Sequence, residues 1–118
     1  MPEVARGNQT DTVASEDGSG ICCAEPDTHA TNQCSETVFV NNIGVVRQTD
    51  IMLPHPAPVP CCTTHSPPMV ECSTLVFVEQ KGLARKGDIY ILDGINHVVS
   101  SGSADTFDGS PRGIPSFP

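Results

Sequence analysis

The chain has 118 residues, a formal net charge of −8 and only six Lys or Arg residues. Nucleic-acid binding requires a basic face that neutralises phosphates, so this composition argues against that class of protein. No stretch approaches the ~20 apolar residues of a membrane-spanning helix, and no basic segment precedes an apolar one at the N-terminus, so we expect synthesis in the cytoplasm without a signal peptide.

Residues 1–20 are acidic, contain Gly and Ser, and hold almost no large apolar side chain. Such a segment cannot bury enough apolar surface to offset its loss of entropy, so it is predicted to be a flexible N-terminal arm. The rest of the chain is rich in Pro and β-branched residues, with eleven Pro in total. These features exclude long helices and favour an all-β fold with a thin core.

The main feature of the chain is a repeat at a spacing of 38 residues. Cys34-Ser35 recurs as Cys72-Ser73, and the following residues recur in order. The recurring positions are Val38, Phe39, Val40, Gly44, Arg47, Asp50 and Ile51, matched by Val76, Phe77, Val78, Gly82, Arg85, Asp88 and Ile89. A repeat of this kind indicates a supersecondary unit that is too small to bury a core alone.

Each copy predicts a β-hairpin. Apolar segments at 36–40 and 75–78 precede a turn, and a second short strand follows around Val45-Val46 and Leu83-Ala84. Arg47 and Asp50 come next, and they recur in the second copy. Against the alternative of solvated surface charges, this recurrence favours a charge-assisted contact that fixes the turn, with the Asp also accepting from backbone N–H groups.

A degenerate third copy follows the second. Strand-like segments at 90–92 and 96–99 flank Asp93-Gly94, Gly102-Ser103 stands where the other copies have Cys-Ser, and Phe107 takes the place of Phe39 and Phe77. The three copies predict an all-β fold of short strands that share one core, in an arrangement compatible with pseudo-threefold symmetry, with little or no helix. Residues 110–118 are too Pro-rich for a strand or helix and are expected to lie over a surface.

The four histidines lie in the segments that lead into these units. His29, His65 and His97 precede the three copies, and His55 lies in the Pro-rich connector before the second. If the units surround a threefold axis, the first three converge near one point and His55 supplies a fourth ligand. We therefore predict a zinc site, with iron as the alternative metal, against the other possibility of four surface histidines.

The six cysteines leave three interpretations open. Cys62 and His65 are spaced for a shared metal, so a Cys could replace His55 as a ligand. Alternatively, Cys22 or Cys23 could bridge Cys34, and Cys61 or Cys62 could bridge Cys72. The third interpretation is that Cys34 and Cys72 are buried free thiols where strands begin.

The repeated residues resemble the PAAR-repeat family over about residues 21–109. The resemblance rests on Cys34-Ser35 through Asp50 and on Cys72-Ser73 through Asp88, although the Pro of the family motif is missing from both copies. Membership would imply a small cone of short β-strands, built from three degenerate repeats with pseudo-threefold symmetry. Such a tip protein caps the trimeric β-helical spike of a contractile tail or injection system and helps to pierce a target envelope. It would also imply a metal near the vertex, for which His29, His55, His65 and His97 are the candidates.

The partners that the resemblance implies are a trimeric spike protein, with one copy of this chain on a homotrimer, and a transient contact with the target membrane. The protein would act at the tip of a virion tail or injection apparatus, and we expect it not to be an enzyme. No phosphate loop, nucleophile elbow or paired carboxylates are visible in the sequence. The alternative function is a small disulfide-rich binding module or a secreted toxin-like protein.

Overall fold

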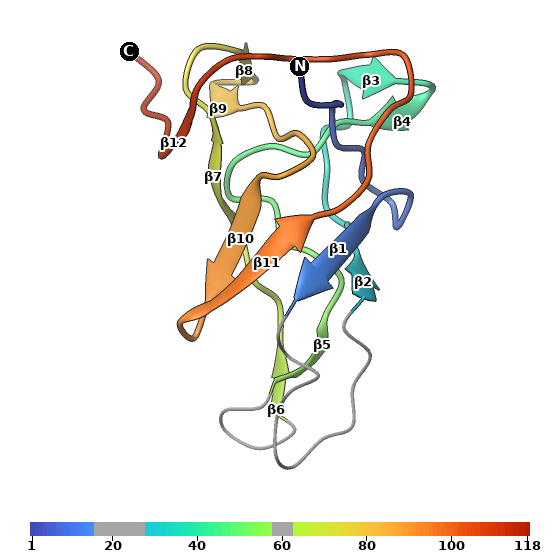
Figure 1. Ribbon diagram of the computed structural model, residues 1–118, viewed down its shortest axis with the longest axis vertical. Coiled ribbons are helices and arrows are strands. Elements are labelled where there is room, and N and C mark those ends of the chain that lie inside the picture. Colours follow the sequence, from blue (N-terminus) through green and yellow to red (C-terminus); the bar gives the residue numbers. More distant parts are fainter. Residues whose placement is uncertain (16–27, 58–62) are drawn as a thin grey trace.

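The computed structural model describes residues 1–15, 28–57 and 63–118, and within these ranges the fold is all-β without a helix (Figure 1). The strands are β1 (Thr12–Ser15), β2 (Thr28–Ala30), β3 (Phe39–Val40), β4 (Ile43–Gly44), β5 (His55–Ala57), β6 (Thr63–His65), β7 (Met69–Ser73), β8 (Phe77–Val78), β9 (Lys81–Gly82), β10 (Ile89–Leu92), β11 (Ile95–Val99) and β12 (Arg112–Gly113). The predicted fold class is confirmed.

One sheet of six antiparallel strands, in the order β12-β7-β10-β11-β1-β2, forms the body of the molecule. Three separate two-stranded hairpins complete it: β3–β4, β8–β9 and β5–β6. The first two lie at one end of the molecule together with both termini, and β5–β6 lies towards the other end (Figure 1). We call the first of these the hairpin end.

The recurring hairpins use the same two-residue turn. Asn41 and Asn42 have φ values of 55° and 66°, and Glu79 and Gln80 have 55° and 69°. Two successive positive φ angles define the type I′ turn, whose twist suits a short hairpin. The second strand of each hairpin lies two residues nearer the turn than predicted. Beyond it, Val45 and Leu83 still donate a backbone N–H within their own units and also bridge to a neighbouring unit.

Gly44 and Gly82 recur because the chain has no room for a side chain there. A Cβ at Gly44 would collide with the carbonyl oxygen of Ser35, and one at Gly82 would lie 2.5 Å from that of Ser73. The close approach lets the backbone N–H of each Ser reach the next strand, with Ser35 donating to Val45 O at 2.8 Å and Ser73 to Leu83 O at 2.9 Å.

A closed ring of backbone hydrogen bonds lies at the centre of the molecule. Ala5 N donates to Ala84 O, Ala84 N to Val46 O, and Val46 N to Ala5 O, each at 3.0 Å. All three residues are fully buried. Three segments from distant parts of the chain therefore meet in equivalent environments, which is the pseudo-threefold arrangement expected from the repeat.

The third unit is a composite of both ends of the chain. Ser103 N donates to Val4 O, as the matching Ser residues do in the other two units, and Glu3 bridges to Phe107 as Gly44 pairs with Phe39. The second half of this unit is thus residues 3–13. The prediction of a flexible arm is wrong for residues 1–15, because Val4, Ala5 and Val13 complete the core; residues 16–20 lie outside the described ranges.

The predicted Arg–Asp contact is confirmed and occurs a third time. In the first copy, Asp50 Oδ2 accepts from both the backbone N and the Nε of Arg47, at 2.8 and 2.9 Å. Arg85 and Asp88 repeat this geometry at 2.7 and 2.6 Å. Arg6 and Asp11 do so in the composite unit at 2.7 and 3.0 Å. Each buried carboxylate is satisfied by a charge-assisted fork, so it fixes its turn.

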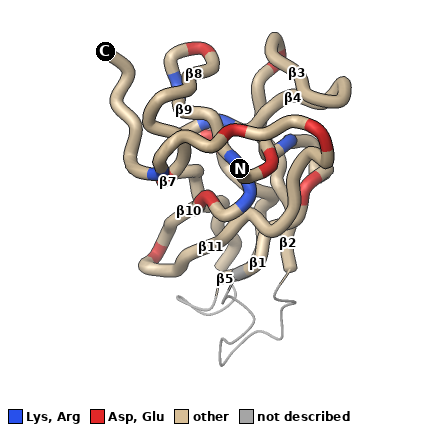
Figure 2. Tube along the Cα trace, turned by 45° about the horizontal axis from the view of Figure 1, so that its top comes forward, with Lys and Arg blue, Asp and Glu red and all other residues tan. Residues whose placement is uncertain are grey.

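A head-to-tail set of polar contacts joins the three units at the hairpin end. Glu79 accepts from Ser35 at 2.5 Å and from Arg47 at 2.8 Å. Asn41 Oδ1 likewise accepts from Ser103 at 2.7 Å and from Arg6 at 3.2 Å. The third contact pairs Asp108 Oδ2 with Arg85 Nη1 at 3.2 Å. We call these three contacts the clasps; acidic and basic residues are accordingly interspersed at this end (Figure 2).

The core next to the ring also contains three equivalent pairs of residues, one for each unit. The residue two positions after each Asp is buried and pairs with a residue of a neighbouring strand: Val13 with Val99, Met52 with Thr31, and Tyr90 with Met69. Five of these six residues, all but Thr31, belong to one buried cluster with the three ring residues. The 38-residue repeat therefore describes packing as well as strands.

The C-terminal segment differs in part from its prediction. Arg112–Gly113 forms β12 and pairs with Ser73 and Cys72 of β7, because Arg112 Nε is held by Asp88 at 2.7 Å. Beyond it, Pro115 O accepts from Gln48 at 3.0 Å, and Phe117 packs on Phe77 with ring centroids 5.2 Å apart. In the described part of the chain, no helix is long and apolar enough to cross a membrane.

Candidate metal centre

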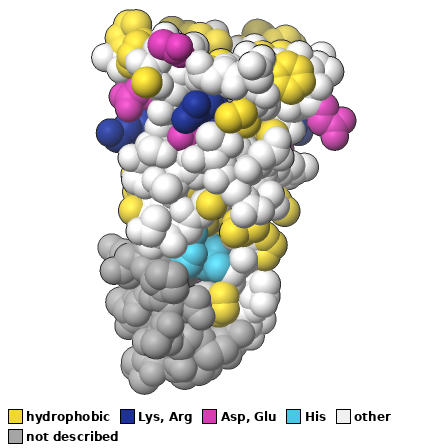
Figure 3. Space-filling view, turned by 90° about the vertical axis from the view of Figure 1, so that its right-hand side faces the viewer, with side chains coloured by type: hydrophobic (Ala, Val, Ile, Leu, Met, Phe, Trp, Pro, Cys, Tyr) yellow, Lys and Arg dark blue, Asp and Glu magenta, His cyan; other side chains and the backbone are white. Residues whose placement is uncertain are grey.

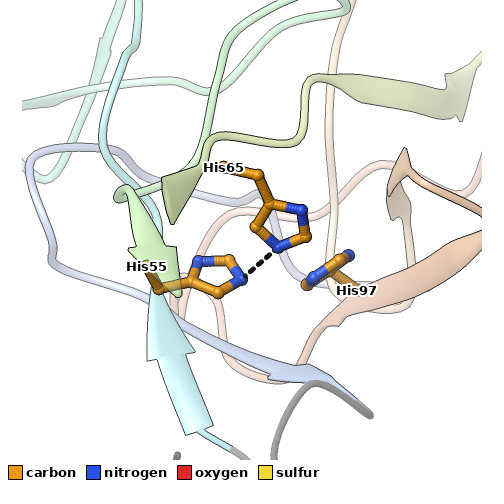
Figure 4. Close-up of side chains that lie close together, drawn as sticks. All are labelled: His55, His65 and His97. Carbon is orange, nitrogen blue, oxygen red and sulfur yellow. Dashed lines mark hydrogen bonds between the residues drawn. The ribbon is translucent and has the colours of Figure 1, made fainter. Parts of the chain in front are cut away.

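Three buried histidines meet on the side of the core opposite the hairpin end (Figures 3 and 4). His55 begins β5, His65 ends β6 and His97 lies in the middle of β11. Each offers a ring nitrogen, and these atoms all lie within 4.8 Å of one another. The three side chains are close enough to bind a metal ion.

Strand pairing explains why these side chains converge. His55 and His65 are direct cross-strand partners in β5–β6, so their side chains lie on the same face of the hairpin. His97 is buried between exposed Asn96 and Val98, as expected for alternation along a strand. His55 and His65 therefore lie within strands, whereas the sequence placed them only in segments that lead into the second unit. His97 lies in the strand-like segment expected at 96–99.

The hydrogen bonds of the Nδ1 atoms fix the tautomers. His55 Nδ1 lies 3.0 Å from Leu53 O, and His97 Nδ1 lies 3.1 Å from Ile95 O. A carbonyl oxygen only accepts, so each Nδ1 carries a proton, and in the neutral imidazole Nε2 is then the atom with the lone pair. Backbone oxygen atoms on the Nδ1 side are the usual means of orienting a metal-binding imidazole.

The Nε2 atoms of His55 and His65 lie 2.9 Å apart (Figure 4). His65 Nδ1 lies 3.1 Å from Asp93 Oδ2, so this imidazole also carries its proton on the Nδ1 side. The contact between the two Nε2 atoms then needs a cation between them. A proton there gives the N–H···N hydrogen bond drawn in Figure 4, and a metal ion can take its place. In a tetrahedral site with Zn–N bonds of about 2.0–2.1 Å, ligand nitrogens lie about 3.3 Å apart. The geometry fits such a cation.

His29, the fourth predicted ligand, is near the group but outside it. Its ring, in β2, stacks on that of His55 with centroids 3.9 Å apart and an interplanar angle of 20°. The ring nitrogens that lie mutually close belong to His55, His65 and His97 only, among the described residues. His29, predicted as a ligand, therefore lies beside the three histidines that are close enough to bind a metal ion.

Two of the six cysteines lie in described segments, and both are free thiols. Cys34 is half-buried and Cys72 is buried. Because both are free, the suggested disulfides to Cys34 and Cys72 are wrong, and the chain is not a scaffold with all six cysteines paired. The suggestions for Cys22, Cys23, Cys61 and Cys62, including the Cys62 ligand, fall outside the described residues.

The two thiols fill space beside the recurring glycines. The Sγ atom of Cys34 packs at Gly44 and that of Cys72 at Gly82. In the composite unit the sizes are exchanged, because Glu3 stands at the Gly position and Gly102 at the Cys position; a Cβ at Gly102 would lie 2.8 Å from that of Glu3. This exchange explains the Cys residues as packing groups, and burial raises the pKa of Cys72 to about 12.

Sequence reasoning missed two parts of the structure. Residues 4–6 are the counterpart of Leu83-Ala84-Arg85, and the shared Ala-Arg pair was the available signal. It was hidden because Asp11 follows Arg6 at a longer spacing than in the other two copies. The second missed part is the contact between Asp93 and His65. In the sequence, Asp93 before Gly94 indicates only a turn.

No protein-family model matches the chain. A search of curated proteins found no match either. The functional argument therefore depends on the geometry.

Proposed function

We propose that the protein is a structural tip that caps a trimeric β-helical spike of a contractile tail or injection system. The observation that carries this proposal is the ring formed by Ala5, Val46 and Ala84, by which one chain presents three equivalent faces. A single chain with internal threefold symmetry matches the end of a homotrimer without needing two further copies.

The hairpin end has the properties of the docking surface. Phe39 and Phe107, at equivalent positions, are 56% and 45% exposed, and Phe77 at the third position is half-buried. Val38, Leu75 and Val76 are exposed beside them, and hydrophobic atoms are visible at this end in Figure 3. Exposed apolar groups in this number mark an interaction surface. The short strands of the hairpins offer main-chain groups to which spike strands can be added.

The opposite end would hold the metal and form the point that meets the target envelope transiently. Zinc suits three imidazole nitrogens, has no preferred geometry of its own, and needs no redox chemistry for a structural role. Its binding would also supply folding free energy to a molecule with a small core. Iron remains the alternative metal.

Docking can be tested with the trimeric β-helical spike protein encoded in the same genome. We expect one copy of this chain per spike trimer in size-exclusion chromatography with light scattering. Replacing Phe39 and Phe107 with Ser should abolish the complex because it removes two of three equivalent apolar contacts. Val98→Ser, on β11 with 36% exposure, is the control and should bind normally. Equal binding by both variants would contradict the proposed surface.

The metal centre is tested separately by elemental analysis of protein purified without chelator. We expect about one zinc per chain, and little in a variant carrying His97→Ala. A stably folded wild-type chain without zinc or iron would contradict this part of the proposal. Docking and metal content have separate outcomes, since the two sites lie at opposite ends of the molecule.

A further inference from the structure

The three histidines are oriented in two different ways. His55 and His97 each place Nδ1 against the carbonyl oxygen two residues upstream, at Leu53 and Ile95. These contacts come from the backbone of the same segment. His65 instead places Nδ1 3.1 Å from Oδ2 of Asp93, a side chain from the β10–β11 hairpin. One histidine of the centre thus has a carboxylate partner from another element.

Asp93 is well placed for this contact. It is the first residue of the Asp93-Gly94 turn, with φ values of 57° and 73°, and the same hairpin carries His97 four residues later. The Asp93 side chain is 41% exposed, while that of His65 is 6% exposed. A carboxylate on the solvent side therefore contacts an imidazole that is almost entirely buried.

We propose that Asp93 is a positioning residue of the metal centre. It keeps the His65 proton on Nδ1, directs the Nε2 lone pair at the metal, and increases the basicity of the ring. It also supplies negative charge to a site whose three imidazoles are neutral. This inference rests on the proposed metal centre and concerns how firmly the ion is held, not which partner the tip binds.

The competing explanation is that Asp93 is present only for the turn. Asp tolerates positive φ, but Asn does so at least as well, and Asn-Gly is a strongly preferred type I′ pair. Asp93→Asn therefore keeps the turn and a neutral acceptor while it removes the charge. Asp93→Gly also fits the turn and removes the acceptor altogether. The pair of variants separates the turn from the contact with His65.

The experiment measures zinc affinity of the full chain by competition with a chromophoric chelator, together with the melting temperature of the metal-free protein. We expect about 10-fold weaker zinc binding for Asp93→Asn and up to about 100-fold for Asp93→Gly. The metal-free melting temperature of Asp93→Asn should equal that of wild type. The visible spectrum of the cobalt-loaded protein should also shift in both variants, because the field of the His65 ligand changes.

Glu36→Gln is the matched control, since it removes one negative charge from an exposed position beside the β3–β4 hairpin and should leave zinc affinity unchanged. Wild-type affinity and spectrum in Asp93→Asn and Asp93→Gly would overturn the inference and leave the metal centre standing. Equal weakening in Glu36→Gln would also overturn it, because a net-charge effect would then be responsible. Failure of wild type to bind zinc or cobalt would overturn the metal centre itself.

Discussion

Thr49 has a φ of 73°, a conformation that is unfavourable for a β-branched residue. It immediately precedes Asp50, at the position that Gly87 occupies with a φ of 92° in the second unit. The backbone N of Thr49 is nevertheless held 2.9 Å from Met69 O, so the surrounding structure imposes the conformation. The first unit therefore contains local strain that the second avoids.

Replacing Thr49 with Gly should stabilise the protein. Relief of an unfavourable φ should stabilise the folded state by about 1–3 kcal/mol. The greater freedom of Gly in the unfolded chain offsets up to about 1 kcal/mol of this gain. We expect a net gain of about 1 kcal/mol in the free energy of unfolding, measured by urea denaturation. Gly87→Thr should have the opposite effect. A loss of stability in Thr49→Gly would contradict this account.

The two described thiols should differ in reactivity. Cys72 is fully buried and its pKa is raised to about 12 by burial, so almost no thiolate exists at pH 8. Cys34 is half-buried, and burial raises its pKa in the same direction. With iodoacetamide at pH 8 on the folded protein, peptide mass spectrometry should show modification of Cys34 before Cys72. Both should react in urea; rapid labelling of Cys72 in the folded protein would contradict its burial.

At the scale of elements, the clasps connect units that are distant in sequence. The Asp108 clasp has an ion pair with Arg85, and Asp108 Oδ1 accepts from the hydroxyl of Ser110 at 2.6 Å. Burial raises the pKa of Asp108, but the hydrogen bonds from Ser110 and the charge of Arg85 outweigh it, so the net shift is downwards. The ionised form is therefore favoured in the folded state.

A lowered pKa in the folded state gives a defined pH dependence. The stabilisation by Asp108 is present above the unfolded value of about 3.9 and is lost as pH falls through the lower folded value. Asp108→Asn should cost about 1–3 kcal/mol at pH 7, since Arg85 loses one of its two charged partners and keeps only Asp88, and much less near pH 2. Thermal unfolding across this range measures the difference. The stability difference between Glu36→Gln and wild type should not shrink towards pH 2 in this way. A cost of Asp108→Asn that does not depend on pH would contradict the role given to the ionised Asp108.

Much of this arrangement follows from the sequence. The recurrence of Arg47 and Asp50 as Arg85 and Asp88 predicted the turns correctly, because a contact within four residues depends on local geometry. The strand bounds were less accurate, since Val45 and Leu83 lie beyond the two-residue strands and bridge to neighbouring units through Arg6 and Arg47. The grouping of the histidines required tertiary information, because only strand pairing places His55 opposite His65 and leaves His29 stacked on His55.

At the scale of the whole molecule, residues 1–15 are a structural part of the third unit. Deleting residues 1–11 removes Ala5 from the central ring and both members of the Arg6–Asp11 pair. We expect this variant to lose cooperative thermal unfolding, as monitored by circular dichroism, because two units cannot close the core. Deleting residues 114–118 is the control and should retain a cooperative transition. A truncated 12–118 chain that melts like the full chain would contradict the composite unit.

The bridge between Glu3 and Phe107 also has a topological consequence. The three units form a closed circle. The hairpins of the first two units are continuous polypeptide, whereas the two halves of the third unit are joined only by non-covalent contacts. This join within the third unit is a seam, and a force that spreads the circle should open it first. A circular permutant that links the ends and starts between Asn41 and Asn42 would move the seam to the first hairpin and make the present one covalent.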